Sequence, residues 1–467
     1  MENTNTNTDE SFRDSLATVT ADGKRKWIFP KKPSGVFYTA RNIVSFFLLA
    51  FLFGAPFIKI DGHPFILLNI IERQFIIFGI PFGPQDLHLF ALSMIAVIVS
   101  IFLFTVIYGR LFCGWICPQT VFMEMVFRKI EYWIEGDWKK QIALKKAALS
   151  GQKIFKKSLK QTIFFSISFI IANTFLAYII GVEEVLRYVQ DTPAQHFSTF
   201  LAVLIFSGIF YFIFSYFREQ ACTILCPYGR LQGVMLDPNS IVIHYDYKRG
   251  EPRGKIRKDE ITNNGDCIDC HLCVDVCPTG IDIRNGTQLE CVNCTACIDV
   301  CDSVMNKINR PKRLIKYASK NEIETGKRSL FTPRAIGYSI VLFILTALIS
   351  YLLITRSDVE MSILRTPGML YQEQPGDKIS NFYDVKIINK TFNSIHVSLS
   401  LENIEGEIRL IGNEKLVAEP QNLAESKFLI ILSKNDIKAL RTKILVAVKS
   451  KGKTLDNIET SFIGRTN

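Results

Sequence analysis

The sequence predicts a multi-domain membrane protein with a five-span α-helical membrane domain, an α+β cytoplasmic insert and a C-terminal all-β sandwich. Three observations predict it: five long segments without charge, the grouping of all 12 cysteines before residue 302, and alternating apolar residues after residue 356. The chain has 467 residues, of which 48% are apolar and 12% aromatic. This composition excludes a mainly disordered chain, a collagen-like chain and a small disulfide scaffold.

Five segments are long and apolar enough to cross a bilayer, which takes about 20 residues. They are Asn42–Ile58, Leu89–Tyr108, Gln161–Gly181, Phe197–Phe217 and Ala335–Thr355. A further apolar run, Pro64–Phe82, is interrupted by Glu72 and Arg73. We expect this run to be interfacial or re-entrant, because charged side chains are costly inside lipid.

Lys and Arg are concentrated in alternate segments between the predicted membrane spans. Lys and Arg number 7 in the first 41 residues, 2 in 59–86, 11 in 109–160 and 1 in 182–196. Since cytoplasmic loops carry the excess of Lys and Arg, the N-terminus is predicted in the cytoplasm and the C-terminus outside. Topology therefore accounts for the net charge of +11, and no nucleic-acid partner is expected.

The predicted organisation has five parts. Residues 1–40 form a cytoplasmic segment whose first 20 residues are expected to be disordered and to lack a cleavable signal. Residues 41–217 hold four transmembrane helices, 218–334 the cytoplasmic insert, 335–355 the fifth helix and 356–467 the outer sandwich. In the last part, Ile395, Val397, Leu399 and Leu401 alternate with polar residues, which is typical of a half-buried strand. Similar runs occur at Tyr383–Ile388, Ile408–Ile411, Phe428–Leu432 and Lys443–Val448.

Eight cysteines of the insert follow the spacing of a bacterial two-cluster ferredoxin, at about residues 258–306. Each of two quartets reads C-x2-C-x2-C-x3-C, and a proline follows the first quartet only. In that pattern the fourth cysteine of each quartet ligates the other cluster. One [4Fe-4S] cluster would be held by Cys267, Cys270, Cys273 and Cys301, and the second by Cys291, Cys294, Cys297 and Cys277. Structural zinc is the alternative, but zinc sites rarely repeat this spacing.

The other four cysteines form two C-x3-C-P motifs, Cys113–Pro118 after the second span and Cys222–Pro227 after the fourth. The two units of span and motif look like an internal repeat. If the spans pack together, Cys113, Cys117, Cys222 and Cys226 could meet as redox or copper thiols, because soft thiolates select Cu(I), zinc or iron–sulfur centres. The alternatives are four inert buried cysteines or a redox-active dithiol.

Histidines give a weaker signal. His88 begins the second span and His196 precedes the fourth, so both are weak candidates for copper or haem ligands on the outer face. Such interfacial histidines are more often solvated. His271 lies in a cluster loop, where we expect it to tune hydrogen bonding. Because no flavin or nicotinamide fingerprint is visible, the electron donor stays unidentified.

The combined motifs resemble the accessory protein family of the cbb-type cytochrome c oxidase, known as CcoG, FixG or RdxA. The resemblance covers the chain from about residue 24 onward. The resembling residues are Lys26–Pro30, Pro84–Asp86, Gly109–Pro118, Glu131–Gly136, Glu219–Arg230, both cysteine quartets and Cys301–Met305.

The resemblance implies a protein of the bacterial inner membrane with two [4Fe-4S] clusters and an immunoglobulin-like periplasmic domain. It also implies a role in maturation of the copper-containing oxidase, with reduction of Cu(II) to Cu(I) as the activity. Its partners would be oxidase assembly factors or a copper transporter, within membrane lipid. Two alternative interpretations are a quinol-linked electron-transfer subunit that feeds a periplasmic reductase, and a non-enzymatic redox-sensing scaffold.

Overall fold

The computed structural model describes residues 17–20, 22–71, 74–192, 194–255, 264–329, 331–368, 370–412, 416–437, 439–450 and 452–464. The first 16 residues, most of the segment expected to be disordered, lie outside the described residues, as do Glu72 and Arg73. The chain divides into two compact units, each described by itself. Unit 1 comprises Met1–Phe57, Leu92–Ala177 and Gly181–Ala347, and unit 2 comprises Ile58–Ala91, Tyr178–Ile180 and Leu348–Asn467.

Among the described residues, five helices are long and apolar enough to span a membrane, as predicted. They are α1 (Val36–Gly54), α2 (Leu87–Tyr108), α7 (Gly151–Ile180), α9 (Phe197–Phe212), which continues as the π-helical turn η5 (Ile213–Phe217), and α15 (Pro333–Ile354). Helix α7 begins ten residues before the predicted span, because Ser150 caps it by accepting a hydrogen bond from the Lys153 amide. Its first turns are therefore charged, and the apolar part follows.

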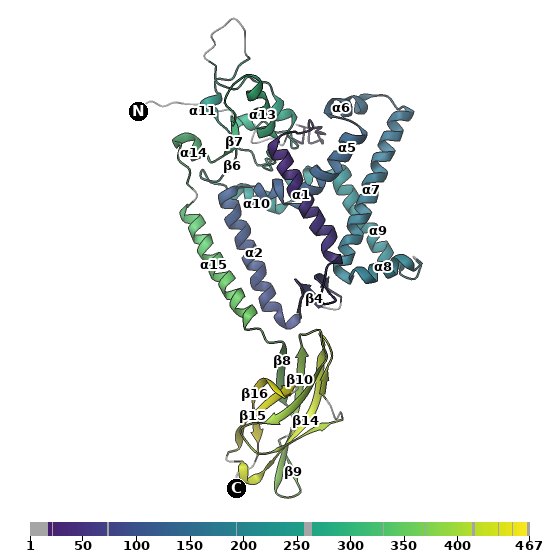
Figure 1. Ribbon diagram of the computed structural model, residues 1–467, viewed down its shortest axis with the longest axis vertical. Coiled ribbons are helices and arrows are strands. Elements are labelled where there is room, and N and C mark those ends of the chain that lie inside the picture. The colour runs from purple at the N-terminus through teal and green to yellow at the C-terminus, as the bar shows by residue number, and fades with distance from the viewer. Residues whose placement is uncertain are drawn as a thin grey trace. The chain divides into compact units, whose positions relative to one another are not determined.

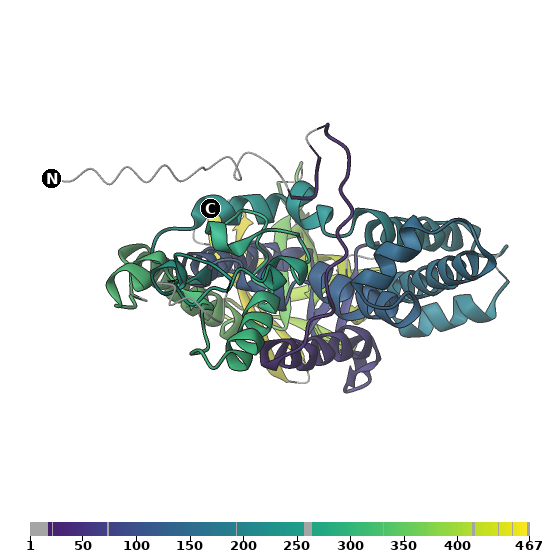
Figure 2. The ribbon, with the colours of Figure 1, turned by 90° about the horizontal axis from the view of Figure 1, so that it is seen from above.

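Aromatic side chains pack the helices of unit 1 together. Helices α7 and α9 run side by side (Figure 1; Figure 2), with Phe175 against Phe206. Phe127 is fully buried between Phe164 of α7, at 4.8 Å between ring centroids, and Phe214 of η5, at 4.5 Å. Stacked and edge-on pairs of this kind stabilise beyond their buried area. Phe127 thus joins the connection after α2 to the helices that follow it.

The two C-x3-C-P motifs fold in the same way. In each, the amide of the second cysteine donates to the carbonyl of the residue before the first cysteine, from Cys117 to Phe112 at 2.9 Å and from Cys226 to Ala221 at 2.8 Å. The second cysteine then caps a helix whose first residue is proline, where no amide hydrogen is needed. The segments around the motifs are α3 (Leu111–Trp115), α4 (Pro118–Thr120), η4 (Val121–Phe127), α5 (Arg128–Ile134), α6 (Trp138–Lys146), η6 (Ala221–Leu225) and α10 (Pro227–Met235).

The cysteine-rich insert is a small α+β fold within unit 1. Strand β6 (Val242–Tyr245) pairs antiparallel with β7 (Ile315–Ala318). Ile243, Ile298 and Leu314 are almost fully buried in its core. The remaining elements are α11 (Tyr247–Gly250), α12 (Leu272–Asp275), η7 (Ile283–Asn285), α13 (Ala296–Lys307) and α14 (Lys320–Thr325). The connection between α7 and α9 holds α8 (Val182–Gln190).

The stretch that we expected to be interfacial or re-entrant is a short β structure in unit 2. Strands β1 (Lys59–Ile60) and β2 (His63–Pro64) form one hairpin, and β3 (Ile66–Asn69), β4 (Gln74–Ile77) and β5 (Ile80–Phe82) form an antiparallel meander. The run is rich in β-branched and aromatic residues and is broken by Gly79. Those features favour strands over a re-entrant helix.

The C-terminal part is a two-sheet β structure, which agrees with the predicted sandwich. One sheet has the order β12 (Glu407–Ile411), β14 (Leu423–Ser433), β10 (Lys378–Asn389) and β8 (Val359–Arg365), with β9 (Gln372–Gln374) beside β10. The second has the order β13 (Leu416–Ala418), β11 (Ile395–Leu401), β15 (Arg441–Ser450) and β16 (Lys453–Ile463). The Tyr383 hydroxyl of β10 donates to the Ser461 carbonyl of β16 at 3.0 Å, which ties the sheets together across the core.

A buried carboxylate fixes the start of α2 to the β structure of unit 2. Asp86 lies in the short helix η3 (Pro84–Asp86) and is 2% exposed. It pairs with Arg356 at 2.8 Å and with Lys390 at 2.9 Å. Both cations are largely buried, so their charges need compensation, which Asp86 gives to Arg356 and which Asp86 and Glu360 give to Lys390.

We expect Asp86→Asn to destabilise unit 2, because it leaves Arg356 buried without the carboxylate it pairs with and leaves Lys390 with Glu360 alone. Loss of one member of a buried ion pair costs about 3–5 kcal/mol. The measurement is the thermal unfolding midpoint of the full chain in detergent. Glu425→Gln, which breaks the exposed pair between Lys386 and Glu425, is the control and should leave the midpoint unchanged. Equal midpoints for all three proteins would contradict this role for Asp86.

Candidate electron-transfer site

The four cysteines predicted to hold the first [4Fe-4S] cluster surround one cavity. Cys267, Cys270, Cys273 and Cys301 line about 380 Å³ of space that no protein atom fills. Three of these residues come from the loop around α12, and Cys301 comes from α13. The cysteine that is distant in sequence therefore reaches the first loop because α13 packs against α12.

A second cavity of about 330 Å³ is lined by Cys277, Cys291, Cys294 and Cys297. Cys273 lines this cavity as well as the first one. The two cavities therefore share a wall. No three His, Cys, Asp or Glu side chains of the described residues converge closely enough to hold a single metal ion. The structure thus spreads the thiols of each set around a space instead of gathering them at a point.

The two cysteine loops have the same backbone. Asp269 and Asn293 follow the first cysteine of each quartet by two residues, and both are left-handed, with φ of 52° and 54°. His271 and Thr295 follow by four residues and are also left-handed, with φ of 56° and 65°. Left-handed backbone is uncommon at residues other than glycine. Its recurrence at matching positions of the two quartets therefore indicates that both loops form the same kind of functional site.

Burial disfavours the thiolate form of three cavity cysteines when no metal is bound. Burial is the main cause that raises the pKa of Cys273, Cys291 and Cys301, each to about 12. A cationic iron centre would supply the positive charge that makes these thiolates stable. Two buried donors beside the loops have no hydrogen-bond partner among the described residues, the Tyr245 hydroxyl group, which belongs to a residue lining the first cavity, and the side-chain amide nitrogen of Asn293. Both donors suit the sulfur atoms of a cluster.

The four thiols of the C-x3-C-P motifs are brought together, next to the second cavity. Burial and then the proximity of Cys117, Cys113 and Cys226 raise the pKa of Cys222 to about 12. The Cys113 thiol lies 2.9 Å from the Gln232 side-chain oxygen, and the Gln232 amide in turn donates to Thr105. Cys113 and Cys222 also pack in one buried cluster with Val276, Val292, Cys294, Ala296, Tyr228, Cys297 and Val300.

Arg41 of α1 joins the first motif to the cysteine loop of the second cavity. Its guanidinium is buried and donates to the Gly114 carbonyl at 3.0 Å and to the Cys294 carbonyl at 2.9 Å. Gly114 approaches the same loop so closely that a Cβ there would lie 2.5 Å from the carbonyl oxygens of Val292 and Asn293. The motif and the loop are therefore in backbone contact, which only glycine allows at this position.

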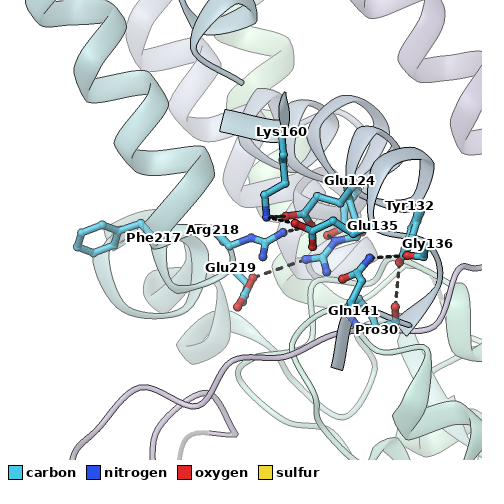
Figure 3. A network of polar contacts seen from close by, with 12 residues as sticks. Pro30, Glu124, Tyr132, Glu135, Gly136, Gln141, Lys160, Phe217, Arg218 and Glu219 are labelled. Carbon is cyan, nitrogen blue, oxygen red and sulfur yellow. Dashed lines mark hydrogen bonds and ion pairs between the residues drawn. The ribbon is translucent and has the colours of Figure 1, made fainter. Parts of the chain in front are cut away.

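A network of buried charges joins the segment after the first motif to the segment before the second one (Figure 3). Glu131 pairs with Arg218 and, at 3.3 Å, with Lys160 of α7. Lys160 also pairs with Glu135 at 2.9 Å. The network continues through Arg128, which pairs with Glu124 at 2.9 Å and with Glu219 at 3.6 Å, and through Arg25, which reaches Glu219 at 3.5 Å.

The Glu131 carboxylate of this network stays ionised in mild acid. Burial by itself would raise the pKa of Glu131, but Arg218, Lys160 and Arg128 outweigh it and lower that pKa to about 2. Arg218 and Glu219 lie four and three residues before Cys222, so the ion pairs that they form with Glu131 and Arg128 position the second motif. The network thus fixes one motif relative to the other.

Comparison with known proteins places these features in a family. The match to 4Fe-4S dicluster domains covers residues 217–320, and the match to the IG-like fold at the C-terminal of FixG covers 349–465. Protein RdxB of Cereibacter sphaeroides is 34% identical over 79% of this chain and 80% of its own length. Protein RdxA of the same organism is 31% identical over 81% and 83%, and the nitrogen fixation protein FixG of Rhizobium meliloti is 29% identical over 88% and 87%.

The chain belongs to the RdxA, RdxB and FixG family. It is thus a membrane protein of an iron–sulfur electron-transfer family, with ferredoxin domains and an immunoglobulin-like C-terminal domain.

A second iron–sulfur match, to a 4Fe-4S binding domain, covers residues 90–141. That range holds only the first C-x3-C-P motif and none of the eight ferredoxin cysteines. In this FixG-family chain the residues around both cavities fit an iron–sulfur cluster, because they offer thiols on several sides and unpartnered donors beside them. The exact ligand sets stay a prediction.

The histidine candidates of this FixG-family chain have local partners. His196 lies 3.0 Å from the Asp191 carboxylate and stacks on Tyr188. His88 contacts the Gln85 carbonyl at 3.3 Å. Beside the first cavity, His271 lies 2.9 Å from the Arg284 guanidinium. The ligand role of His88 and His196 stays a prediction.

Sequence reasoning missed the residues that position the thiols. Arg41 stands at the start of the first apolar run and looks like an ordinary cytoplasmic flank. Glu131 and Glu135 stand in a stretch that resembles the family, and the sequence alone assigns them no role. A signal was present, because carboxylates this close to a predicted span are rarely left unpaired. Their partners, however, come from α7 and from the segment after α9, which sequence spacing does not reveal.

We expect Gly114→Ala to disturb the second cavity. The added Cβ would meet the carbonyl oxygens of Val292 and Asn293, so the cysteine loop must shift away. Anaerobically purified protein should then lose iron from this cavity and the matching electron paramagnetic resonance signal, while the first signal stays. Gly151→Ala is the matched control, since nothing lies within 4 Å of its Cβ position. Full iron and both signals in the Gly114 variant would contradict the close contact.

We expect Glu131→Gln to destabilise unit 1 by about 3–5 kcal/mol, because Arg218 and Lys160 lose a buried partner. The lowered pKa of Glu131 also sets a pH dependence. Its contribution is present above pH 4.5 and is lost as the pH falls toward about 2. Thermal unfolding of the full chain between these limits should therefore show a smaller loss of stability for the variant than for the wild type. Glu184→Gln, from the exposed pair with Arg187, is the control.

Proposed function

We propose that this protein is a membrane-bound iron–sulfur electron-transfer protein that reduces Cu(II) to Cu(I) for delivery of copper during assembly of a cbb-type oxidase. The proposal rests on one observation. The thiols of the two C-x3-C-P motifs meet beside the cysteine loop of the second cavity. A set of soft thiol ligands, which suits Cu(I), therefore lies next to a cavity that suits an iron–sulfur cluster, a carrier of single electrons.

The cysteines also provide a continuous route between the two kinds of site. Cys273 lines both cavities, and Cys294 and Cys297 of the second cavity pack in the same buried cluster as Cys113 and Cys222. We propose that Cys267, Cys270, Cys273 and Cys301 hold the first [4Fe-4S] cluster and that Cys291, Cys294, Cys297 and Cys277 hold the second. The clusters supply single electrons. The motif thiols hold the copper, which gains one electron and passes from Cu(II) to Cu(I).

The proposed placement is the bacterial inner membrane, with the N-terminus in the cytoplasm and the C-terminal domain in the periplasm. The distribution of Lys and Arg among the connecting segments supports this orientation. Oxidase assembly factors or a copper transporter are the proposed partners. A reducing cytoplasm would keep the motif thiols free of disulfides, and all 12 cysteines are free in the structure.

We expect the double variant Cys113→Ser and Cys226→Ser to lose Cu(II) reduction while its clusters remain. The protein is purified anaerobically, reduced with dithionite, desalted and mixed with Cu(II), and Cu(I) is measured with a chelating dye. Electron paramagnetic resonance and iron content check the clusters. Ser303→Ala, which removes an exposed hydroxyl outside both sites, is the control. Undiminished copper reduction in the double variant would remove the motif thiols from the mechanism.

A pure scaffold makes the opposite prediction in cells. If the electron-transfer role holds, replacing the eight ferredoxin cysteines by serine should lower assembled oxidase, and excess Cu(I) supplied under reducing conditions should restore it. Membrane levels of the variant protein, measured by immunoblotting, control for its loss. Normal oxidase assembly in the presence of a cluster-free protein would instead support a scaffold.

A further inference from the structure

The end of the cysteine route that is remote from the motif thiols reaches the protein surface. Of the 12 cysteines, all of which the structure describes, Cys270 alone is exposed. It lines the first cavity, which Cys273 joins to the second one, and the second cavity adjoins the motif thiols. The surface beside Cys270 is therefore the place where an electron donor outside this chain can approach the route.

Four exposed cations lie beside this surface, and we call them the basic rim. They are Arg253, Lys255, Lys312 and Arg313. They come from two separate segments, one before the first cysteine quartet and one after the second. Charges that are spread over two segments cover a surface instead of converging in a pocket. Such a surface suits a macromolecule of opposite charge.

A hydrogen bond holds the first segment of the basic rim against the cysteine loop. The amide of Gly254, which lies between Arg253 and Lys255, donates to the Cys267 carbonyl at 3.1 Å. Cys267 is the first cysteine of the first quartet and lines the first cavity. Both cations are therefore fixed next to the backbone that carries the thiols of this cavity.

The second segment of the basic rim is bonded to the same region. The Lys312 carbonyl accepts a hydrogen bond from Arg249 at 3.0 Å, and Arg249 pairs at 2.6 Å with Asp266, the residue before the first quartet. The Arg313 amide donates at 2.7 Å to Asp302, the residue after the last cysteine of the second quartet. That cysteine also lines the first cavity, so both segments of the rim border it.

Arginines compensate the acidic side chains near the exposed cysteine. Asp269, directly before Cys270, pairs with the buried guanidinium of Arg284. Glu251, the exposed acid of the first segment, pairs with Arg253 at 3.6 Å. With these carboxylates paired, the lysines of the rim leave the surface with an excess of positive charge. A partner with an acidic face would complement it.

The chemistry of the route narrows the choice of partner. The sequence has no flavin or nicotinamide fingerprint, so the electrons come from outside the chain. Iron–sulfur centres exchange single electrons, and the donor must therefore release electrons one at a time. A small ferredoxin with an acidic surface meets both requirements, because it carries one-electron chemistry and the charge that the rim attracts.

We propose that the basic rim docks a small acidic ferredoxin, which donates electrons at the Cys270 surface. The proposal rests on the electron-transfer role proposed above and names its electron donor. In each encounter one electron leaves the iron–sulfur centre of the ferredoxin, which is oxidised, and reduces the centre held by the cysteines of the first cavity. No proton or atom is transferred. Opposite charges on the two surfaces speed the encounter and orient the partners.

Binding is tested first, by calorimetric titration of the full chain in detergent with oxidised plant-type ferredoxin as the probe. The wild-type protein should bind it at a salt concentration of about 0.01 M and lose binding at about 1 M, where charges are screened within a few ångströms. The double variant Lys255→Glu and Lys312→Glu should bind at least about tenfold more weakly at the lower salt concentration, because like charges then face each other.

The matched control makes the same change of charge far from the cysteines in sequence. Lys427→Glu with Lys443→Glu alters side chains of the C-terminal β structure that are 66% and 81% exposed. This variant should bind ferredoxin like the wild type. An absence of binding, or equal binding by the rim variant and the control, overturns the docking surface. Equal binding is also the result expected of a rim that contacts only anionic lipid.

Electron entry is tested next, with reduced ferredoxin as the reductant and cluster absorbance as the signal. The rim variant should be reduced at least about tenfold more slowly than the wild type at low salt. Photoreduced deazaflavin, a small uncharged reductant, should reduce both proteins at the same rate. Equal slowing of the rim variant with both reductants would place the effect in the clusters and overturn the docking role.

The same proteins separate this proposal from the copper proposal. After reduction with deazaflavin, the rim variant should reduce Cu(II) like the wild type, because its motif thiols are intact. A wild-type protein that accepts electrons from ferredoxin but does not reduce Cu(II) would overturn the copper role and leave the docking surface standing. A wild-type protein that reduces Cu(II) after deazaflavin but takes no electrons from ferredoxin would overturn the docking surface alone.

Discussion

The buried charge network around Glu131 is the interaction on which the arrangement of the thiols depends. Charged groups are costly to remove from water, and they remain buried only where opposite charges compensate them. Here Glu131, Glu135 and Glu219 are each matched by arginine or lysine from another segment of unit 1. Any displacement of the segments would leave a desolvated charge without a partner. The network therefore specifies one arrangement of the two C-x3-C-P motifs, although it contributes no thiol itself.

A second constraint ties this arrangement to the cysteine-rich insert. Arg41 satisfies a carbonyl of the first motif and a carbonyl of the second cysteine loop with a single side chain. Asp299 of α13 accepts hydrogen bonds from the amides of Phe37 and Tyr38, so the start of α1 is capped by the insert. The membrane helix and the insert thus complete each other's hydrogen bonds. This explains how a small domain with short strands keeps a fixed position beside the motif thiols.

Burial of the thiols connects folding to metal loading. Because burial raises the pKa of Cys222, Cys273, Cys291 and Cys301 to about 12, these thiols stay neutral in the metal-free chain. Metal binding must displace the protons, and the resulting thiolates are then stabilised by the bound cations. Neutral thiols are also less reactive toward oxidants than thiolates. Burial therefore keeps these thiols neutral before a metal binds, and it also protects them from oxidation until then.

The sequence by itself determined the five membrane helices, the ferredoxin character of the insert and the β character of the last part. Each of these is set by local patterning, because uncharged runs, fixed cysteine spacing and alternation along a strand are properties of neighbouring residues. Strand β11 was predicted with its observed bounds, Ile395–Leu401, since its apolar residues alternate without interruption. Strand β16, Lys453–Ile463, was missed because polar residues break its alternation, and only pairing with β15 makes it a strand. The meeting of Cys113 with Cys222, the role of Arg41 and the basic rim beside Cys270 were decided by tertiary structure alone. They depend on which segments face each other across long stretches of sequence, and that choice follows from packing and charge compensation among distant residues.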